Sequence, residues 1–349
     1  MRTRIRSLFS KASAQPWFSD PTYHQIVQTK PAAPLPNSLP PIPEHLPRPW
    51  YFKHGRSSPW EAKIPSTNQD PLLESGVKHA SRLAAHCLKE ASKLVKPGVT
   101  TEEIDDFARE WAFANGAVPS SLNYSGFPKS ICTSVNNVVA HGIPDKTILK
   151  EGSIINLDIA LFAAHPSDPS ACFHGDTSAT FPVGQISPLS SRLLEATKLA
   201  LDEGIKACGP GNRYEEIGLA VERVAEEHGY EINTALCGHG IGREYHQNPL
   251  IIHCGRPPFA LLCRNIIIKL LSANDKSNEI MLPGTIFTVE PVLCEGGAEF
   301  SVWNDNWTIV TDDGGRSAQF EHTIMITEDG VEILTDLGKE EQREVMYVQ

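Results

Sequence analysis

The chain has 349 residues, with 31 Lys and Arg against 42 Asp and Glu, and therefore a formal net charge of −11. A hydrophobic fraction of 40% excludes wholesale disorder. The acidic balance disfavours nucleic acid or an anionic membrane as the main partner. No run approaches the ~20 apolar residues of a membrane helix. Eight cysteines without a CxxC pair predict reduced thiols, because neither a zinc ribbon nor a disulfide scaffold is supported.

The charge is distributed unevenly along the chain. The first acidic residue is Asp20, and the basic residues before it leave a net charge of −15 on the remainder. On a helix, the apolar residues of segment 1–14 fall on one face, which predicts a mitochondrial transit peptide within residues 1–30, with a disordered basic tail as the alternative. Eight prolines between residues 31 and 50 then predict an extended linker over 31–69.

The folded domain is predicted to begin near Asp70 and to extend to residue 338, with a tail over 339–349. Apolar residues with a period of 3.6 predict two pairs of helices, and Thr100 with Glu103 forms a capping-box pattern. Strand-like runs follow each pair. Helices are expected at 72–91, 100–115, 188–207 and 214–228, and strands at 154–160, 171–183, 285–292 and 319–327. This order predicts an internally duplicated α+β domain.

Five residues have the chemistry of a dinuclear metal site. Such a site needs several carboxylates and one or two imidazoles that converge on two ions. Four acids lie within apolar, strand-like runs, where a carboxylate is costly unless it is paired or metal-bound, and one histidine lies among glycines. They are Asp158, Asp176, Glu290, Glu321 and His239. Each acid alone is more often a salt-bridged or edge residue, but four together favour the metal site. His174 and His322 beside them are interpreted as ordinary exposed histidines.

With these residues in place, the chain resembles the type I methionine aminopeptidases over roughly residues 71–337. The motifs that carry the resemblance occur in order at Asn136–Asp145, Asn156–Asp158, His174–Ser178, Gly238–Gly242, Thr288–Pro291 and Ser317–Thr323. The resemblance implies the duplicated pita-bread fold, in which an antiparallel sheet is flanked by helix pairs. It also implies removal of an N-terminal methionine when the next residue is small.

The resemblance further implies a role for each residue of the metal set. Asp158 would bind one divalent ion, His239 and Glu290 the other, and Asp176 and Glu321 would bridge both. Glu290 would also accept and transfer the proton. Mixed carboxylate and imidazole ligands suit Mn, Fe, Co or Zn without deciding among them.

The substrate residues are also expectations from the resemblance. The two histidines outside the metal set, His141 and His246, would contact the scissile amide and stabilise the developing oxyanion. Aromatic walls and a soft contact for the methionine thioether would come from Tyr124, Phe127, Cys132, Tyr245 and Trp307. Without the resemblance, aromatic residues at such positions are more often plain core.

Several departures from the family pattern bear on location and access. No cysteine precedes Cys87, so the zinc region of cytosolic eukaryotic members is absent, and Ser125 stands where many members have a histidine. Both departures favour an organellar branch and a mitochondrial matrix location, with the cytoplasm as the alternative. Two insertions are predicted, near 163–171 as a longer turn and near 255–279 as a surface element, a contact region or retained non-coding sequence.

Two other interpretations stay open at this point. One is an X-Pro aminopeptidase or prolidase of the same fold, and the other is a non-catalytic pita-bread protein that binds a partner. The expected partners are N-terminal peptide substrates, with ribosome-associated nascent chains among them, and neither nucleic acid nor membrane. A monomer is expected.

Overall fold

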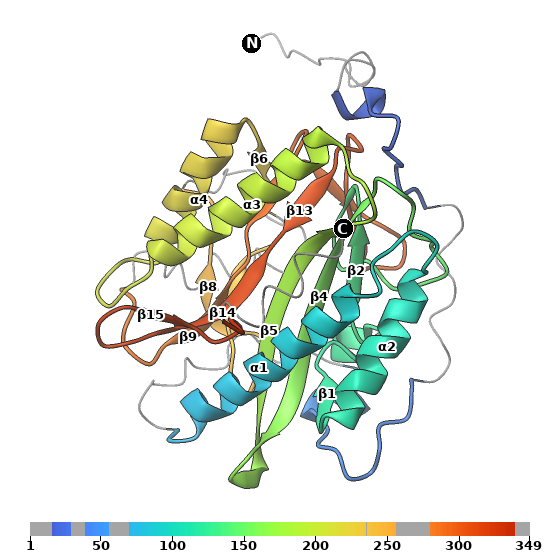
Figure 1. Cartoon of the computed structure of the whole chain (residues 1–349). Helices are drawn as coiled ribbons and strands as arrows, with labels where there is room; N and C mark the ends of the chain where they lie inside the picture. The colour runs from blue at the N-terminus through green and yellow to red at the C-terminus, as the bar shows by residue number, and fades with distance from the viewer. Residues whose placement is uncertain (1–15, 29–38, 56–69, 235, 256–279, 339–349) are drawn as a thin grey trace, which may run out of the picture.

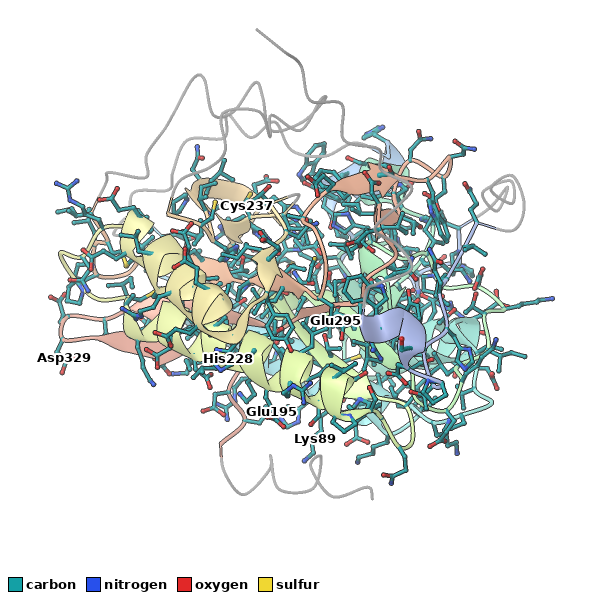
Figure 2. All side chains as sticks on the ribbon, turned by 90° about the horizontal axis from the view of Figure 1, so that it is seen from above. Lys89, Glu195, His228, Cys237, Glu295 and Asp329 are labelled. Atoms are coloured by element: carbon teal, nitrogen blue, oxygen red, sulfur yellow. The ribbon has the colours of Figure 1, made fainter. Side chains whose placement is uncertain are left out.

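The computed structural model describes residues 16–28, 39–55, 70–234, 236–255 and 280–338. Over these residues two pairs of helices cover one side of a curled antiparallel sheet (Figure 1). The helices are α1 (Leu73–Ser92), α2 (Thr101–Ala114), α3 (Pro188–Lys206) and α4 (Glu215–His228). Seen from above, α3 and α4 carry exposed polar side chains such as Glu195 and His228 on their outer face (Figure 2). Among the described residues, no helix combines the length and the apolar composition that crossing a membrane requires.

The main sheet has the order β1-β4-β5-β14-β9-β7-β8, with β2 paired to β4 and β15 paired to β14. Its strands are β1 (Ala117–Pro119), β2 (Cys132–Val135), β4 (Ile154–His165), β5 (Asp168–Pro182), β7 (Gly238–Gly240), β8 (Gln247–Ile251), β9 (Ile286–Val289), β14 (Glu321–Ile326) and β15 (Val331–Ile333). The central strand β14 pairs with β5 on one side and with β9 on the other, which joins the two halves of the chain.

Two small sheets complete the described part of the fold. One has the order β13-β10-β6 and the other the order β11-β12-β3. Their strands are β13 (Ser317–Gln319), β10 (Val292–Cys294), β6 (Glu231–Ile232), β11 (Phe300–Val302), β12 (Ile309–Thr311) and β3 (Val138–Ala140). The runs that the sequence analysis treated as single strands, 285–292 and 319–327, are therefore each divided between the main sheet and the β13-β10-β6 sheet.

The helix predictions are confirmed to within a residue or two at each end, because local signals define these boundaries. At α2 the backbone N–H of Glu103 donates to Thr100 Oγ1 at 3.2 Å, and the Thr100 N–H donates to Glu103 Oε2 at 2.7 Å. This reciprocal pair is the predicted capping box. At α3 the side chain of Ser187 caps the helix and Pro188 occupies its first turn.

The strand β4 has one face for packing and one for polar side chains. Its apolar residues Ile155, Leu157, Ile159 and Leu161 pack with α1 and α2 in one buried core. Because side chains alternate along a strand, Asp158 points to the opposite face of the sheet. The acid that interrupts an apolar run in the sequence thus lies away from the helices.

The β4–β5 hairpin differs from its prediction. A longer turn was expected around 163–171, but the two strands continue to His165 and Asp168, and only Pro166 and Ser167 lie between them. The hairpin tip is held by His165, whose ring nitrogens bond the hydroxyls of Ser75 in α1 and Ser167. Added residues extend both strands because each new pair gains ladder hydrogen bonds that a loop would lack. Most of the second predicted insertion, residues 256–279, lies outside the described residues.

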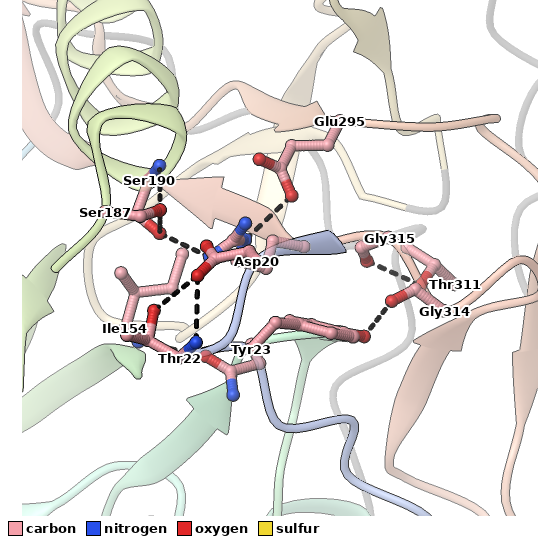
Figure 3. Close-up of polar contacts among 12 residues, drawn as sticks. Asp20, Thr22, Tyr23, Ile154, Ser187, Ser190, Glu295, Thr311, Gly314 and Gly315 are labelled. Carbon is pink, nitrogen blue, oxygen red and sulfur yellow. Dashed lines mark hydrogen bonds and ion pairs between the residues drawn. The ribbon is translucent and has the colours of Figure 1, made fainter. Parts of the chain in front are cut away.

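Residues 16–28 and 39–55, which we call the N-terminal arm, pack against the domain. Trp17 is only 2% exposed, and Arg316 joins two acids, bonding Asp20 at 2.9 Å and Glu295 at 2.8 Å. Tyr23 of the arm donates its hydroxyl to the carbonyl of Gly314 (Figure 3). The packed structure thus begins upstream of Asp70, where the sequence analysis placed its start. The division into leader, linker and domain stays a prediction.

Candidate metal centre and substrate site

Register across the main sheet brings the predicted metal ligands together. Asp158 of β4 and Glu321 of β14 each lie directly opposite Ser178 of β5. Residues directly opposite each other project from the same face, and so do residues two apart on one strand. Asp176, two residues before Ser178, is therefore on that face as well. Three of the four predicted acids meet on the face of the sheet away from the helices.

The other half of the chain contributes His239 and Glu290. His239 lies in β7, and its Nε2 is 3.7 Å from Asp176 Oδ2 and 3.8 Å from Glu290 Oε1. One ligand atom each from Asp176, His239 and Glu321 lie within 4.8 Å of one another, and all three residues are buried. The structure thus brings four of the five predicted ligands into direct proximity. The fifth, Asp158, shares their face of the sheet.

A threonine between them orients His239 and Glu290. The hydroxyl of Thr288 accepts from the backbone N–H of His239 at 2.9 Å and donates to Glu290 Oε1 at 2.9 Å. Gln319 Nε2 donates to the other carboxylate oxygen of Glu290 at 3.2 Å. His239 Nδ1 contacts the carbonyl of Gly240 at 3.2 Å, so Nδ1 carries the proton. The lone pair of Nε2 is then directed at the acids, which is the arrangement of a metal-binding imidazole.

Electrostatics at this face favour a bound cation. Burial raises the pKa of Asp158 to about 7. Burial, and then the neighbouring carboxylates, raise the pKa values of Asp176 and Glu321 well above their usual range. Burial lowers the pKa of His239 to about 4, so its imidazole is neutral. Several carboxylates in one buried site cannot all ionise cheaply unless a cation joins them.

Two oxygen atoms test whether the residues fit a metal. Asp176 Oδ1 and Glu321 Oε1 are buried and have no hydrogen-bond partner among the described residues. Buried acceptors are rarely left without a partner, and a bound ion is one of the accepted reasons. Together with the neutral imidazole of His239, these oxygens make a donor set that suits a divalent cation.

The segment that carries these residues matches a known protein family. Residues 75–328 match the model of metallopeptidase family M24. The chain belongs to metallopeptidase family M24.

Curated relatives place this M24 peptidase among the methionine aminopeptidases. It is 39% identical over 304 residues to human mitochondrial methionine aminopeptidase 1D, which covers 87% of this chain and 82% of that protein. It is 38% identical over 306 residues to the chloroplastic/mitochondrial methionine aminopeptidase 1D of Arabidopsis thaliana, which covers 84% of this chain and 76% of that protein. The resemblance stated from the motifs is confirmed.

Solved structures support the pita-bread fold of this M24 peptidase. The methionine aminopeptidase of Rickettsia prowazekii superposes with a TM-score of 0.65 at 37% identity, covering 74% of this chain and 95% of that one. The Xaa-Pro dipeptidase of Bacillus anthracis shares the fold with a TM-score of 0.57, but at only 19% identity. The fold prediction is confirmed, and the prolidase interpretation has the more distant support.

One side of the M24 site carries an aromatic group. Tyr124, Tyr245 and His246 contact one another, with ring centroids 5.0 Å apart for the two tyrosines and 4.0 Å apart for Tyr245 and His246. The ring of His246 lies 4.2 Å from that of His239. These contacts place three predicted substrate residues beside the metal ligand set.

A second aromatic group consists of three further predicted substrate residues, Phe127, His141 and Trp307. The ring of Trp307 meets Phe127 edge-on at 5.1 Å and His141 edge-on at 5.8 Å. His141 has a left-handed backbone with φ of 54°, unusual for a non-glycine residue. Cys132 of β2 lies directly opposite Asp158, so its thiol is on the ligand face of the sheet.

Sequence reasoning missed the residues that support these groups. Thr288 and Gln319 hold Glu290 from its two sides, and His253 Nε2 accepts the backbone N–H of Glu290 at 3.0 Å. His174, which was expected to be exposed, is 1% exposed and bonds Ser120. These residue types are common, and only their position next to a predicted ligand motif could have singled them out.

Proposed function

We propose that this chain removes the N-terminal methionine from polypeptides whose second residue is small, with two divalent metal ions held by Asp158, Asp176, His239, Glu290 and Glu321. The observation that carries the proposal is the convergence of these acids and one neutral imidazole on one face of the sheet. Membership of the M24 methionine aminopeptidases gives the reaction class.

The assignment of ligands follows from the resemblance and agrees with the strand positions. Asp176 and Glu321 would each contact both ions, and both have a buried oxygen without a partner among the described residues. Asp158 would hold one ion from β4, and His239 with Glu290 would hold the other from the second half of the chain. Two such ions supply Lewis-acid polarisation of a carbonyl and a lowered pKa of bound water. Mn, Fe, Co and Zn all suit this donor set.

Proton transfer is assigned to Glu290. Thr288 and Gln319 each donate a hydrogen bond to its carboxylate, which fixes its orientation without removing both lone pairs of either oxygen. A carboxylate held this way can accept a proton from the water that attacks the amide and release it to the leaving amine. Glu290 lies between the other proposed metal ligands and Gln319, and we therefore assign this proton transfer to it.

The neutral histidines recognise the scissile amide. Burial lowers the pKa of His141 to about 4, and burial with the nearby imidazoles lowers the pKa of His246 well below its usual range. Both rings therefore stay uncharged at neutral pH and can donate one N–H to a carbonyl oxygen. A donor aimed at the oxygen that becomes negative lowers the barrier more than it strengthens substrate binding.

The two aromatic groups give the specificity for methionine. Tyr124, Tyr245, Phe127 and Trp307 offer flat apolar surfaces, and Cys132 offers a soft contact to the thioether. A methionine side chain is unbranched and flexible, so it fits against flat surfaces that a branched side chain such as leucine would clash with. We also propose an organellar location, because the leader is basic and because relatives have mitochondrial or chloroplastic names. A monomer stays the expectation from the sequence.

A peptide assay tests the proposal. Full-length protein loaded with Mn²⁺ or Co²⁺ is expected to release methionine from Met-Ala-Ser and to leave Leu-Ala-Ser almost intact. A variant that lacks residues 256–278 is assayed beside it to show whether the insertion limits access. Equal cleavage of the two peptides would reject methionine specificity, and hydrolysis of an Xaa-Pro dipeptide assayed beside them would favour the prolidase activity.

A further inference from the structure

Three consecutive residues of the N-terminal arm bind the two segments that carry predicted substrate residues. They belong to the 3₁₀ turn η3 (Trp50–Lys53). Trp50 Nε1 donates to Glu244 Oε2 at 3.0 Å, next to Tyr245 in the chain. The hydroxyl of Tyr51 donates to the carbonyl of Ser120 at 2.5 Å.

The third residue, Phe52, holds the turn that presents Tyr124. Its carbonyl accepts from Asn123 Nδ2 at 2.5 Å. Asn123 and Ser125 on either side of Tyr124 both have left-handed backbones, with φ of 61° and 48°. Such conformations in non-glycine residues are costly and persist only where surrounding contacts support them. The arm supplies one of those contacts.

The ring of Tyr51 is inserted behind the first aromatic group. It is fully buried, meets Tyr124 edge-on at 5.0 Å and stacks on His174 at 6.2 Å. His174 in turn stacks on Tyr245 at 5.4 Å. Tyr51, Tyr124 and Tyr245 form one buried cluster with Ala160, which is on the ligand face of β4. Tyr51 therefore contacts both tyrosines that the proposed function assigns to the methionine side chain, one directly and one through His174.

The phenol of Tyr51 remains a hydrogen-bond donor throughout the working pH range. Burial, and then the negative groups around it, raise its pKa well above the usual value. Its partner is a backbone carbonyl, which can only accept. The hydroxyl thus fixes the ring relative to Ser120, and Ser120 bonds His174 through its own hydroxyl at 2.8 Å. One chain of contacts links the arm to both sides of the aromatic group.

From these contacts we infer that Trp50, Tyr51 and Phe52 form a clasp that positions the methionine site, with Tyr51 fixing the orientation of the contacting pair Tyr124 and Tyr245. This inference rests on the proposed function. The arm would then be a specificity-determining part of the enzyme, although it precedes the M24 domain. Tyr124 and Tyr245 pack edge-on with ring centroids 5.0 Å apart, so together they form one wall of the site. The shape of that wall decides which side chain fits against it, so the clasp acts on selection among substrates more than on the chemical step.

A matched pair of arm tyrosines tests the clasp. Tyr51→Ala removes the ring behind the aromatic group. Tyr23→Ala removes an arm tyrosine that also donates to a domain carbonyl, that of Gly314, and lies under the guanidinium of Arg316. Both variants remove arm packing, so both should lower the thermal midpoint. Only Tyr51→Ala should also change substrate selection.

The expected readout separates a positioning role from a purely structural one. In full-length metal-loaded protein, Tyr51→Ala should raise KM for Met-Ala-Ser about tenfold, leave kcat within about threefold, and reduce the Met-over-Leu selectivity about tenfold. Tyr23→Ala should keep KM and selectivity within about twofold of the parent. Equal changes in the two variants, or an unchanged selectivity in Tyr51→Ala, would overturn the clasp.

Two further measurements distinguish failure of the clasp from failure of the variant to fold and from failure of the proposed function. If Tyr51→Ala does not fold, Tyr51→Leu fills part of the same space with an apolar side chain that has no flat ring, and it should show the same loss of selectivity. The parent enzyme tests the proposed function separately. A parent that cleaves Met-Ala-Ser and Leu-Ala-Ser equally rejects the proposed function and the clasp with it, whereas a selective parent with a selective Tyr51→Leu variant rejects the clasp alone.

Discussion

Asp158 and Glu321 lie directly opposite the same residue, Ser178, from the two strands that flank β5. This relationship places two acids from the two halves of the chain on one row of the sheet, with their Cα atoms about 10 Å apart across two strand spacings. Asp176, on the same face of the intervening strand, lies between them. The ligand set is therefore a consequence of strand order and register, which put acids from β4, β5 and β14 on one surface.

Replacing a proposed bridging ligand should abolish metal binding. In Asp176→Asn or Glu321→Gln the buried oxygen that lacks a partner is lost or becomes a poorer ligand, because an amide carries no charge. Equilibrium dialysis against Mn²⁺ should then show loss of bound metal, with peptidase activity reduced by about a thousandfold or more. Glu328→Gln, an exposed acid in the turn after β14, is the control and should bind metal like the parent. Retention of metal by both ligand variants would contradict the site.

Thr288→Val should weaken the site without removing a ligand. Its hydroxyl links the backbone N–H of His239 to the carboxylate of Glu290, so valine removes one hydrogen bond from each of these groups. Residues that orient metal ligands typically change metal affinity or activity by about 10–100-fold. Thr288→Ser keeps the hydroxyl and should restore most of the affinity for Mn²⁺ in the same dialysis experiment. A serine variant as weak as the valine variant would show that the methyl group, not the hydroxyl, is what the site needs.

Gly175→Ala should destabilise the fold while Gly209→Ala should not. A Cβ at Gly175 would lie 2.2 Å from the backbone nitrogen of Ser81, because β5 packs tightly on α1 at this point. Relieving that overlap requires movement of helix backbone, and overpacking of this kind costs about 1–3 kcal/mol. At Gly209 the nearest atom to the new Cβ, in the Asn212 side chain, is 3.4 Å away. Denaturant unfolding of the two variants should show the difference, and equal midpoints would contradict the close approach.

The ion pair between Asp20 and Arg316 should give the arm a pH-dependent stability. Burial raises the pKa of Asp20, but hydrogen bonds from Ser187, Thr22 and Arg316 outweigh it and hold that pKa below its ordinary value. A lowered pKa in the folded state stabilises the fold above the unfolded value of about 3.9, and this stabilisation is lost as pH falls further.

A comparison of the parent with Asp20→Asn isolates the contribution of the Asp20 carboxylate. The parent should exceed the variant in free energy of unfolding by about 2 kcal/mol between pH 5 and 7. The difference should shrink progressively below about pH 4 as the carboxylate is protonated. Urea unfolding at several pH values measures it. A difference that stays constant down to pH 2 would show that charge on Asp20 is not the source of the stabilisation.

Local signals determined the helices and pointed to the chemistry of this protein from the sequence alone. The capping pair Thr100 and Glu103 defines the start of α2 because both partners lie within one turn. Asp158, Asp176, Glu290 and Glu321 stand out because a carboxylate in an apolar run is too costly to be there without a partner. The order of the motifs then identified the family, which the comparisons confirmed, while the role of each site residue stays a prediction.

Only the tertiary structure decided how distant segments support that chemistry. Thr288, Gln319 and His174 are ordinary residue types, and their roles come from partners that the chain brings near only when it folds. Tyr51 precedes the family domain, yet it packs behind Tyr124 and, through His174, Tyr245. Periodicity in a sequence reports which face of an element is apolar, but the partner of that face depends on register and packing between elements. For this reason the ligands could be proposed from the sequence, and the clasp that holds the aromatic group could not.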